Sequence, residues 1–526
     1  MKTATLKIIL LLAGAVLFNI IFWQEKVALN ALLFDAFILL SVFYLYPAAF
    51  TKPGMKWLLF AHVFALVTLV IQNTLLSKLA FSTTLLLVVV FTQFLHRSVW
   101  YAAASAMGNY LLFVFSFLED VQQFRKGGFK SLGIRKAFRF AIIPLAIAAA
   151  FFLIYSFSNT VFKDVVNSMG LALQHFFSRF FDWFNWERFG FLMLGLFITG
   201  GLLLKMRSNY FSEKEFEKHN DLWRSRNNLA KWKQSIMFDV LSVFMGRFAN
   251  GILALKNEYT VGMISLLLLN VLLLFINAID ITYVWFGFTY TANLNLKDYV
   301  HEGAGMLIFS IVLAMLVLLF FFRGNLNFYK QNKWLRYGAY AWIIQNAVLV
   351  ISVLFRDYYY IVHMGLAYKR IGVLVFLVMV LMGLITVFIK IHQRKTAYYL
   401  WRVNGWFAIV LLVGASAVHW DETIARYNLA HKNTIPVDVK FLLTLSDKTL
   451  PLLEQNQDVL EETRLQVKEE NVYPDRAPFS ARVVFDDRKR NFFETQQSYS
   501  WLSWNAADDY VKKHLTKPAL TSVLNK

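Results

Sequence analysis

Acidic and amide side chains interrupt several apolar segments of this 526-residue chain. An ionised carboxylate that faces lipid is costly, so such residues pair inside a helical bundle or line a path that can carry protons. Asp35 lies about a third of the way into its segment, and Asn270, Asn277 and Asp280 share one face of another by helical spacing. Interhelical hydrogen bonding is the ordinary role of these side chains. Asp35 and Asp280 are the candidate intramembrane acids, and we expect Asp35 to face protein or water.

Motifs for nucleotide, metal or thiol chemistry are missing from the sequence. The basic, glycine-rich stretch that begins at Arg125 lacks the GxxxxGK[ST] spacing of a phosphate-binding loop, and His301-Glu302 fails to open an HExxH motif because residue 305 is glycine. The chain has no cysteine, which excludes disulfides, thiolate catalysis and cysteine-ligated metals. The sequence therefore predicts no metal site and no cofactor. It offers no general acid and nucleophile in a defined geometry, so an enzyme is the less favoured interpretation.

Transmembrane helices are the elements that must position these side chains. Apolar residues make up 58% of the chain and charged residues 16%, against about 45–50% and about 25% in soluble domains. The apolar residues gather in blocks of about twenty, the length that spans the hydrocarbon core. We predict an all-α fold: a polytopic bundle of about 11–12 spans and a small, mainly helical C-terminal extramembrane domain. The twelve candidate segments are Leu6–Trp23, Ala28–Phe50, Trp57–Leu76, Leu79–Leu95, Val99–Leu118, Phe138–Phe157, Phe189–Leu204, Val261–Phe286, Gly303–Phe322, Tyr337–Phe355, Ile371–Ile391 and Trp401–Val418.

The basic residues are distributed unevenly between alternate loops. Four loops, Glu119–Arg139, Lys205–Lys256, Arg323–Arg336 and Lys390–Lys395, hold 23 Lys and Arg, and the three intervening loops hold seven. The positive-inside bias then places the first set in the cytoplasm and the C-terminal tail outside it. We therefore expect a multi-pass protein of the cell (inner) membrane. The same bias explains the net charge of +20, so no nucleic-acid partner is expected. The orientation of the N-terminus and the oligomeric state stay open.

Two polar insertions and the tail complete the organisation. The aromatic-rich stretch Asn159–Arg188 suits a helix in the membrane interface or a lid over the bundle, and Lys205–Lys256 reads as a helical cytoplasmic loop. In the tail we expect helices at Asp421–His431, Val437–Leu445, Leu450–Leu460 and Trp504–Leu515, and a short strand at Arg482–Phe485. The predicted divisions are 1–137, an N-terminal membrane segment; 138–204, a membrane segment with the interfacial helix; 205–256, the cytoplasmic loop; 257–419, the C-terminal membrane bundle; and 420–526, the extracytoplasmic tail.

Short stretches spread over most of the chain resemble a bacterial membrane family known as domain of unknown function 4173, and its broader relative 4153. The GL-x-x-x-RI and IARYN pieces are the more specific ones. Ala367 stands where the family pattern usually has threonine. The resemblance implies a membrane protein and supplies no activity. It rests on Ala141–Pro144, Ser158–Asn159, Asn257–Tyr259, Leu296–Gly303, Arg356–Tyr359, Gly365–Ile371, Asp421–Asn428 and Leu443–Asp447.

Most of these stretches fall at the predicted outer ends of helices. Three of them, distant in sequence, would meet at one outer surface, and we expect Glu302, Arg356 and Arg370 to lie in one region. One role is structural: Glu302 or Asp357 pairs with Arg356 or Arg370 and fixes the helix ends. The other is an anion site, because guanidinium matches phosphate and carboxylate. The candidate outer-face cluster comprises Tyr299, Glu302, Arg356, Tyr359, Lys369, Arg370, Arg426, Tyr427 and Asn428.

Three functions are consistent with this organisation. The favoured one is a membrane protein that binds or moves an envelope component such as an anionic lipid or a saccharide through the outward-facing polar site. In the second, the tail senses a signal and the Lys205–Lys256 loop relays it to a cytoplasmic regulatory partner. The third is a membrane-embedded enzyme. Membrane lipids are the expected partners in each case, and a cavity at the outer site would favour binding or catalysis.

Overall fold

The computed structural model describes residues 2–124, 185–224, 255–287, 296–465 and 479–516, with short helical stretches between 141 and 171. Much of the predicted segment Phe138–Phe157, most of Asn159–Arg188 and residues 225–254 of the cytoplasmic loop lie outside the described residues. In the described part of 205–256, one short helix is present, α9 (Tyr210–Phe216).

Among the described residues, nine helices are long and apolar enough to cross a membrane, and two shorter apolar helices accompany them. They correspond to eleven of the twelve predicted segments, so the all-α polytopic fold is confirmed. The eleven are α1 (Lys2–Phe22), α2 (Leu29–Leu45), α3 (Pro53–Gln72), α4 (Leu75–Gln93), α5 (Val99–Phe124), α8 (Trp186–Leu203), α13 (Leu255–Asp280), α14 (Leu296–Phe321), α15 (Asn332–Met364), α16 (Tyr368–Gln393) and α17 (Ala397–Ser416).

The chain divides into two compact units. The first contains residues 1–24, 34–45 and 107–207, and in it α1 packs on α8. A ring stack between Phe18 and Phe191 and a hydrogen bond from the Asn19 amide to the Arg188 carbonyl (3.2 Å) join these two helices. Gly195 allows the close approach, because a Cβ there would lie 2.9 Å from the Phe18 ring.

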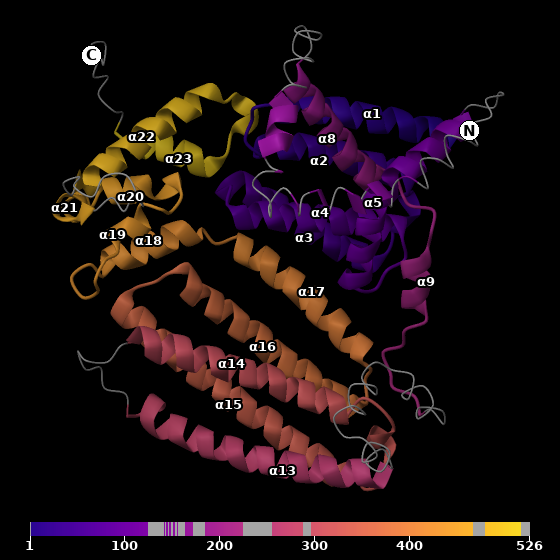
Figure 1. The fold of residues 1–526 in the computed structure, drawn as a ribbon, viewed down its shortest axis with the longest axis vertical. Helices are drawn as coiled ribbons and strands as arrows, with labels where there is room; N and C mark the ends of the chain where they lie inside the picture. The colour runs from indigo at the N-terminus through magenta and orange to yellow at the C-terminus, as the bar shows by residue number, and fades with distance from the viewer. Residues whose placement is uncertain are drawn as a thin grey trace. The chain divides into compact units, whose positions relative to one another are not determined.

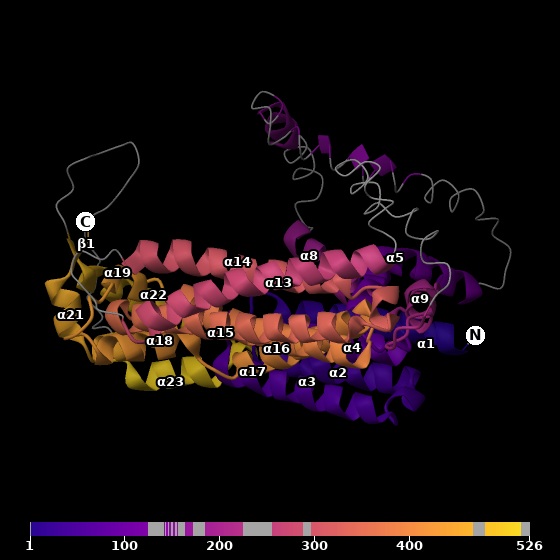
Figure 2. The ribbon, with the colours of Figure 1, turned by 90° about the horizontal axis from the view of Figure 1, so that it is seen from below.

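The second unit holds the remaining residues and contains two groups of membrane helices and the tail. Helix α15 packs on α13, α14 and α16, and α16 packs on α17, as Figures 1 and 2 both show. Their apolar side chains form one cluster, with Phe322, Ile311 and Leu335 fully buried. Polar side chains, Asn346 and Lys390 among them, are buried on the same helices. Helix α17 also packs on α3 and α4.

Helices α3 and α4 form a tight hairpin, as the short gap between the predicted segments Trp57–Leu76 and Leu79–Leu95 implies, but its turn comes earlier than expected. The turn is Asn73-Thr74, whereas the apolar pattern had placed it at residues 76–79. Asn73 adopts the left-handed conformation (φ +47°), which asparagine tolerates. Thr74 caps α4 through a reciprocal capping box with Ser77. The hydrophobic pattern missed the turn because Leu75 and Leu76 follow it without a break.

The C-terminal tail folds around its own apolar core. Leu442, Leu450, Ile424 and Ala425 are fully buried in it. The predicted strand at Arg482–Phe485 is wrong: these residues begin α22, and the two-residue strands at Arg464–Leu465 and Phe479–Ser480 pair instead. The tail elements are α18 (Trp420–Ala430), α19 (Val439–Leu442), η4 (Asp447–Thr449), α20 (Leu450–Glu454), α21 (Gln457–Glu462), α22 (Ala481–Ser498) and α23 (Ala506–His514).

Candidate functional site

The turn between α15 and α16 brings together two of the predicted site residues. Gly365 there has φ +82°, and a Cβ at this position would lie 2.5 Å from Asn428 Oδ1. Asn428, on α18, accepts a hydrogen bond from the Leu366 N–H (2.6 Å) and donates one to the Leu366 carbonyl (2.9 Å). Arg370 donates to the Met364 carbonyl (2.9 Å) and to that of Gly365. Both side chains therefore hold this turn closed.

Arg356, on α15, pairs with Asp280, the last residue of α13. The Arg356 guanidinium lies 2.6 Å from Asp280 Oδ1, and the two residues are 9% and 4% exposed. This joins a residue of the proposed outer cluster to a candidate intramembrane acid. The neighbouring Asp357 is 1% exposed, and its Oδ2 accepts no hydrogen bond.

The pair is one contact in a series of polar contacts between α13 and α15. The Gln345 amide donates to Asn270 Oδ1 (2.8 Å), and the Asn277 amide donates to the Gln345 carbonyl (3.0 Å). The helix face that carries Asn270, Asn277 and Asp280 therefore packs against α15. Its side chains form interhelical hydrogen bonds, which is the ordinary role of such residues.

The other predicted residues have separate environments. The Tyr359 hydroxyl donates to the Val284 carbonyl (3.1 Å), Lys369 is exposed, and Arg426 pairs with Glu422 on the surface of α18 (2.5 Å). Tyr427 packs on the His431 ring at 4.4 Å. Asp35 is 2% exposed, so its side chain faces protein. Tyr299 and Glu302 lie on α14, but their side chains are outside the described residues.

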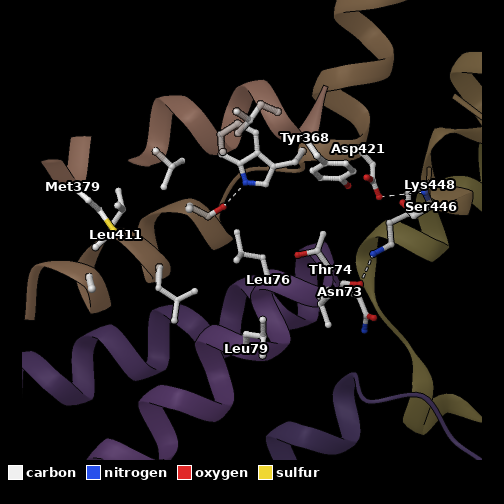
Figure 3. A pocket seen from close by; sticks show the side chains of 18 residues that line it. Asn73, Thr74, Leu76, Leu79, Tyr368, Met379, Leu411, Asp421, Ser446 and Lys448 are labelled. Atoms are coloured by element: carbon white, nitrogen blue, oxygen red, sulfur yellow. Dashed lines mark hydrogen bonds between the residues drawn. The ribbon is translucent and has the colours of Figure 1, made fainter. Parts of the chain in front are cut away.

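A large apolar cleft lies beside the α15–α16 turn. Its volume is about 740 Å³, and it is bounded by the start of α4, by α16, by α17 and by the tail. Leu76, Leu79, Leu411 and Met379 line its apolar length, as Figure 3 shows. We call it the α16–α17 cleft. Its depth and lining fit an aliphatic chain.

One end of the α16–α17 cleft is polar. Asp421, at the start of α18, accepts a hydrogen bond from the Ser446 N–H at 3.2 Å (Figure 3). Asp421 Oδ1 and Ser446 Oγ are buried there without a protein partner. Buried polar atoms left without hydrogen bonds are costly, so this end would be stabilised by a ligand that carries donors and acceptors.

Lys448 supplies the positive charge at the same end. Its ammonium donates to the Asn73 carbonyl (2.6 Å) and to that of Gln72. An ammonium has three donors, so one remains for a ligand. Burial lowers the pKa of Lys448 to about 8.

A second polar network lies at the other end of α17. Glu215, on α9, is 1% exposed and accepts hydrogen bonds from the Tyr398 hydroxyl (2.6 Å), the His96 ring (2.8 Å) and the Arg97 N–H (3.1 Å). His96 also contacts the Ser105 hydroxyl at 2.8 Å. Although the series Ser105–His96–Glu215 resembles a hydrolase triad, Ser105 is fully buried within α5. We therefore interpret the network as a structural anchor for α9.

Sequence reasoning missed both polar networks. Asp421 and Ser446 belong to stretches that carry the family resemblance, and that was the one available signal for them. Lys448 is one basic residue among many in the tail. His96 could not be linked to Glu215 from sequence, because the two residues lie 119 positions apart.

These features define a multi-pass membrane protein with a helical tail domain. The chain belongs to the family of domain of unknown function DUF4153, whose sequence model matches residues 11–456. The matching family is thus the broader relative, and membership of family 4173 is not shown. The matched residues include the α16–α17 cleft and end before α22 and α23. Searches of curated proteins and of solved structures gave no match.

Proposed function

We propose that this protein binds an anionic envelope lipid with a hydroxyl-bearing head in the α16–α17 cleft. The observation that carries the proposal is the amphipathic lining: apolar along its length, with Asp421, Ser446 and Lys448 at one end. A lipid chain already in the bilayer gains little hydrophobic free energy on entering the cleft, because lipid tails are as apolar as the side chains that line it. The head then decides which lipid is preferred.

The polar end favours a head that has both charge and hydroxyl groups. A phosphate would accept a hydrogen bond from the remaining N–H of Lys448. A hydroxyl group would donate a hydrogen bond to Asp421 Oδ1 and form another with Ser446 Oγ. Phosphatidylglycerol carries both kinds of group and is the probe of choice. A neutral glycolipid carries the hydroxyls alone and serves as the comparison.

A sensing role is the second candidate. Trp420, Asp421, Ser446 and Lys448 all belong to the tail and line the cleft, so an occupied cleft would contact the tail directly. Sensing and transport both require the same binding step.

We expect the tail, and with it the polar end of the cleft, to be extracytoplasmic, because 23 basic residues in alternate loops outweigh seven. An alkaline phosphatase fused after Lys526 should be active, and a fluorescent protein fused there should be dark. The opposite pattern would place the polar end in the inner leaflet.

We expect Gly372→Leu to reduce lipid occupancy of the α16–α17 cleft about tenfold, or ~1.4 kcal/mol. Gly372 lines the cleft, and a Cβ there would meet no atom within 4 Å, so the leucine fills the cleft without displacing protein. For the measurement, the protein is reconstituted in phosphatidylethanolamine that contains phosphatidylglycerol with a photoreactive diazirine in its acyl chain. Peptide mass spectrometry then measures labelling of Leu76, Met379 and Leu411.

Gly190→Leu is the matched control, because Gly190 is an exposed helical glycine that also has open space at its Cβ. Labelling should be unchanged in this variant. Equal labelling of wild type and Gly372→Leu, or equal labelling by a phosphatidylethanolamine probe, would refute the proposal.

Acidity provides a further check on the charge of the head. Labelling by phosphatidylglycerol should fall as the pH rises through about 8, where Lys448 loses its proton. A neutral glycolipid probe should show no such fall. A pH-independent phosphatidylglycerol signal would remove Lys448 from the proposed contact. The other charged or titratable groups that act on Lys448 are Asp421, Asp508, Lys26, Lys78 and His419.

A further inference from the structure

A second apolar groove runs along the other side of α17. It has a volume of about 850 Å³ and is bounded by α3, by the end of α4 and by α17. Trp57, Phe60 and Phe64 line it from α3, and Val410 and Gly414 line it from α17. We call it the α3–α17 groove. Ala408, Leu411, Leu412 and Ala415 of the same helix line the α16–α17 cleft, so α17 is the wall between the two.

Basic side chains gather at one end of the α3–α17 groove. Lys52 precedes α3, and Arg97 follows α4; both are exposed and both line the groove. Arg97 uses Nη2 to bond the carbonyls of Glu215 (2.8 Å) and Lys218 (2.9 Å), and its guanidinium has further N–H groups. No acidic residue is among the described residues that line the groove. The charge at this end therefore suits an anion.

The charged ends of the two cavities lie at opposite ends of α3. Lys52 precedes the first residue of this 20-residue helix, whereas Asn73, which bonds Lys448, follows the last one. At 1.5 Å per residue the helix is about 30 Å long, close to the thickness of the hydrocarbon core. A lipid head at Lys52 would therefore lie in the leaflet opposite to a head at Lys448.

We propose that the α3–α17 groove is a second lipid site, which holds an anionic phospholipid with its phosphate between Lys52 and Arg97 and its acyl chain against Trp57, Phe60 and Phe64. Its own lining and charge support this site. Binding there does not require the α16–α17 cleft to be occupied. With both sites occupied, α17 separates two lipids of the same charge class that belong to opposite leaflets. This arrangement is the one expected of a protein that receives lipid on one side of a helix and releases it on the other.

Lys52→Glu tests the charged end, and Lys56→Glu is its matched control. Lys56 is exposed one helical turn further along α3 and does not line the groove. With diazirine-bearing phosphatidylglycerol, wild type should be labelled at Trp57 and Phe64. Lys52→Glu should reduce that labelling about tenfold, and Lys56→Glu should reduce it less than twofold. Equal effects of the two variants would indicate non-specific attraction to a basic surface and would overturn the proposal.

Gly414→Leu tests the apolar length of the groove. Gly414 lines it, and a Cβ there would meet no atom within 4 Å, so the leucine occupies free space. This variant should lose labelling at Trp57 and Phe64 and keep it at Met379, while Gly372→Leu should show the reverse. If Gly372→Leu loses labelling at Met379 but Gly414→Leu leaves labelling at Trp57 unchanged, the groove is refuted and the cleft stands. If Gly414→Leu loses labelling at Trp57 but Gly372→Leu leaves labelling at Met379 unchanged, the cleft is refuted and the groove stands. Labelling of Trp57 by phosphatidylethanolamine in proportion to its abundance would mean bulk lipid contact and would refute the second site.

Discussion

Arg356→Ala is expected to lower the free energy of unfolding by about 3–5 kcal/mol, because it leaves the Asp280 carboxylate buried without its partner. The two side chains are 2.6 Å apart between α13 and α15, and the pair is almost fully buried. The expected result is a large fall in expression and in melting temperature in detergent. An anion site would behave differently, since the folded protein would persist and only ligand binding would be lost.

A double replacement separates pairing from packing. Asp280→Leu combined with Arg356→Met removes both charges and keeps the volume, so its stability should return to within about 1 kcal/mol of wild type. Arg426→Ala is the matched control, because Arg426 forms an exposed pair with Glu422 on one helix and should cost under about 1 kcal/mol. A double variant as unstable as Arg356→Ala would contradict the ion-pair explanation.

The membrane helices could be predicted from sequence because their signal is local. A block of about twenty apolar residues is sufficient evidence for a span, and each of the eleven described apolar helices was found. Their ends were predicted less well: α15 (Asn332–Met364) begins five residues before and ends nine residues after the predicted Tyr337–Phe355. Local signals fail where two patterns compete. Val483 and Val484 favoured a strand, yet Ser480 caps a helix there by accepting from the Arg482 N–H, and Phe485 and Phe492 lie buried on one face of that helix.

Partner choice inside the bundle could not be predicted, because it depends on which helices pack together. The sequence marked Asp280 and Arg356 separately, one as an intramembrane acid and the other as part of an outer cluster. Their pairing spans 76 positions and requires α13 to lie against α15. Asn428 was also singled out, and its contact with Leu366 depends on how the tail lies on the α15–α16 turn.

The α16–α17 cleft could not be predicted from the sequence for the same reason. Its polar end combines Asp421, Ser446 and Lys448 from the tail with the backbone of the α3–α4 turn. The last of these contacts is made by the carbonyls of Gln72 and Asn73, and backbone carbonyls leave no trace in residue type. A sequence can indicate a polar residue near a membrane surface, but a cavity exists only once the helices are packed.

Glu215→Gln is expected to lower the free energy of unfolding by about 3 kcal/mol at pH 7, because a carboxylate that accepts three hydrogen bonds is replaced by a group that accepts fewer. The carboxamide oxygen can still accept from the His96 ring and the Arg97 N–H, but the NH2 group then points at the Tyr398 hydroxyl, which donates in the wild type. The expected signs are a lower melting temperature and faster hydrogen exchange in α9. Glu217→Gln is the control, since Glu217 lies two positions away in an exposed pair with Lys214 and should change stability by less than about 0.5 kcal/mol.

The difference between Glu215→Gln and wild type should also depend on pH in a defined direction. Burial alone would raise the pKa of Glu215, but the hydrogen bonds from His96, Tyr398 and the Arg97 N–H together hold that pKa below its ordinary value of 4.5. A carboxyl whose pKa is lowered by folding contributes stability that is complete above 4.5 and is lost as the pH falls through the folded-state value. The stability gap between wild type and Glu215→Gln should therefore be constant near neutrality and close on acidification below 4.5. A gap that widens in acid would show that the carboxylate is not the form that anchors α9.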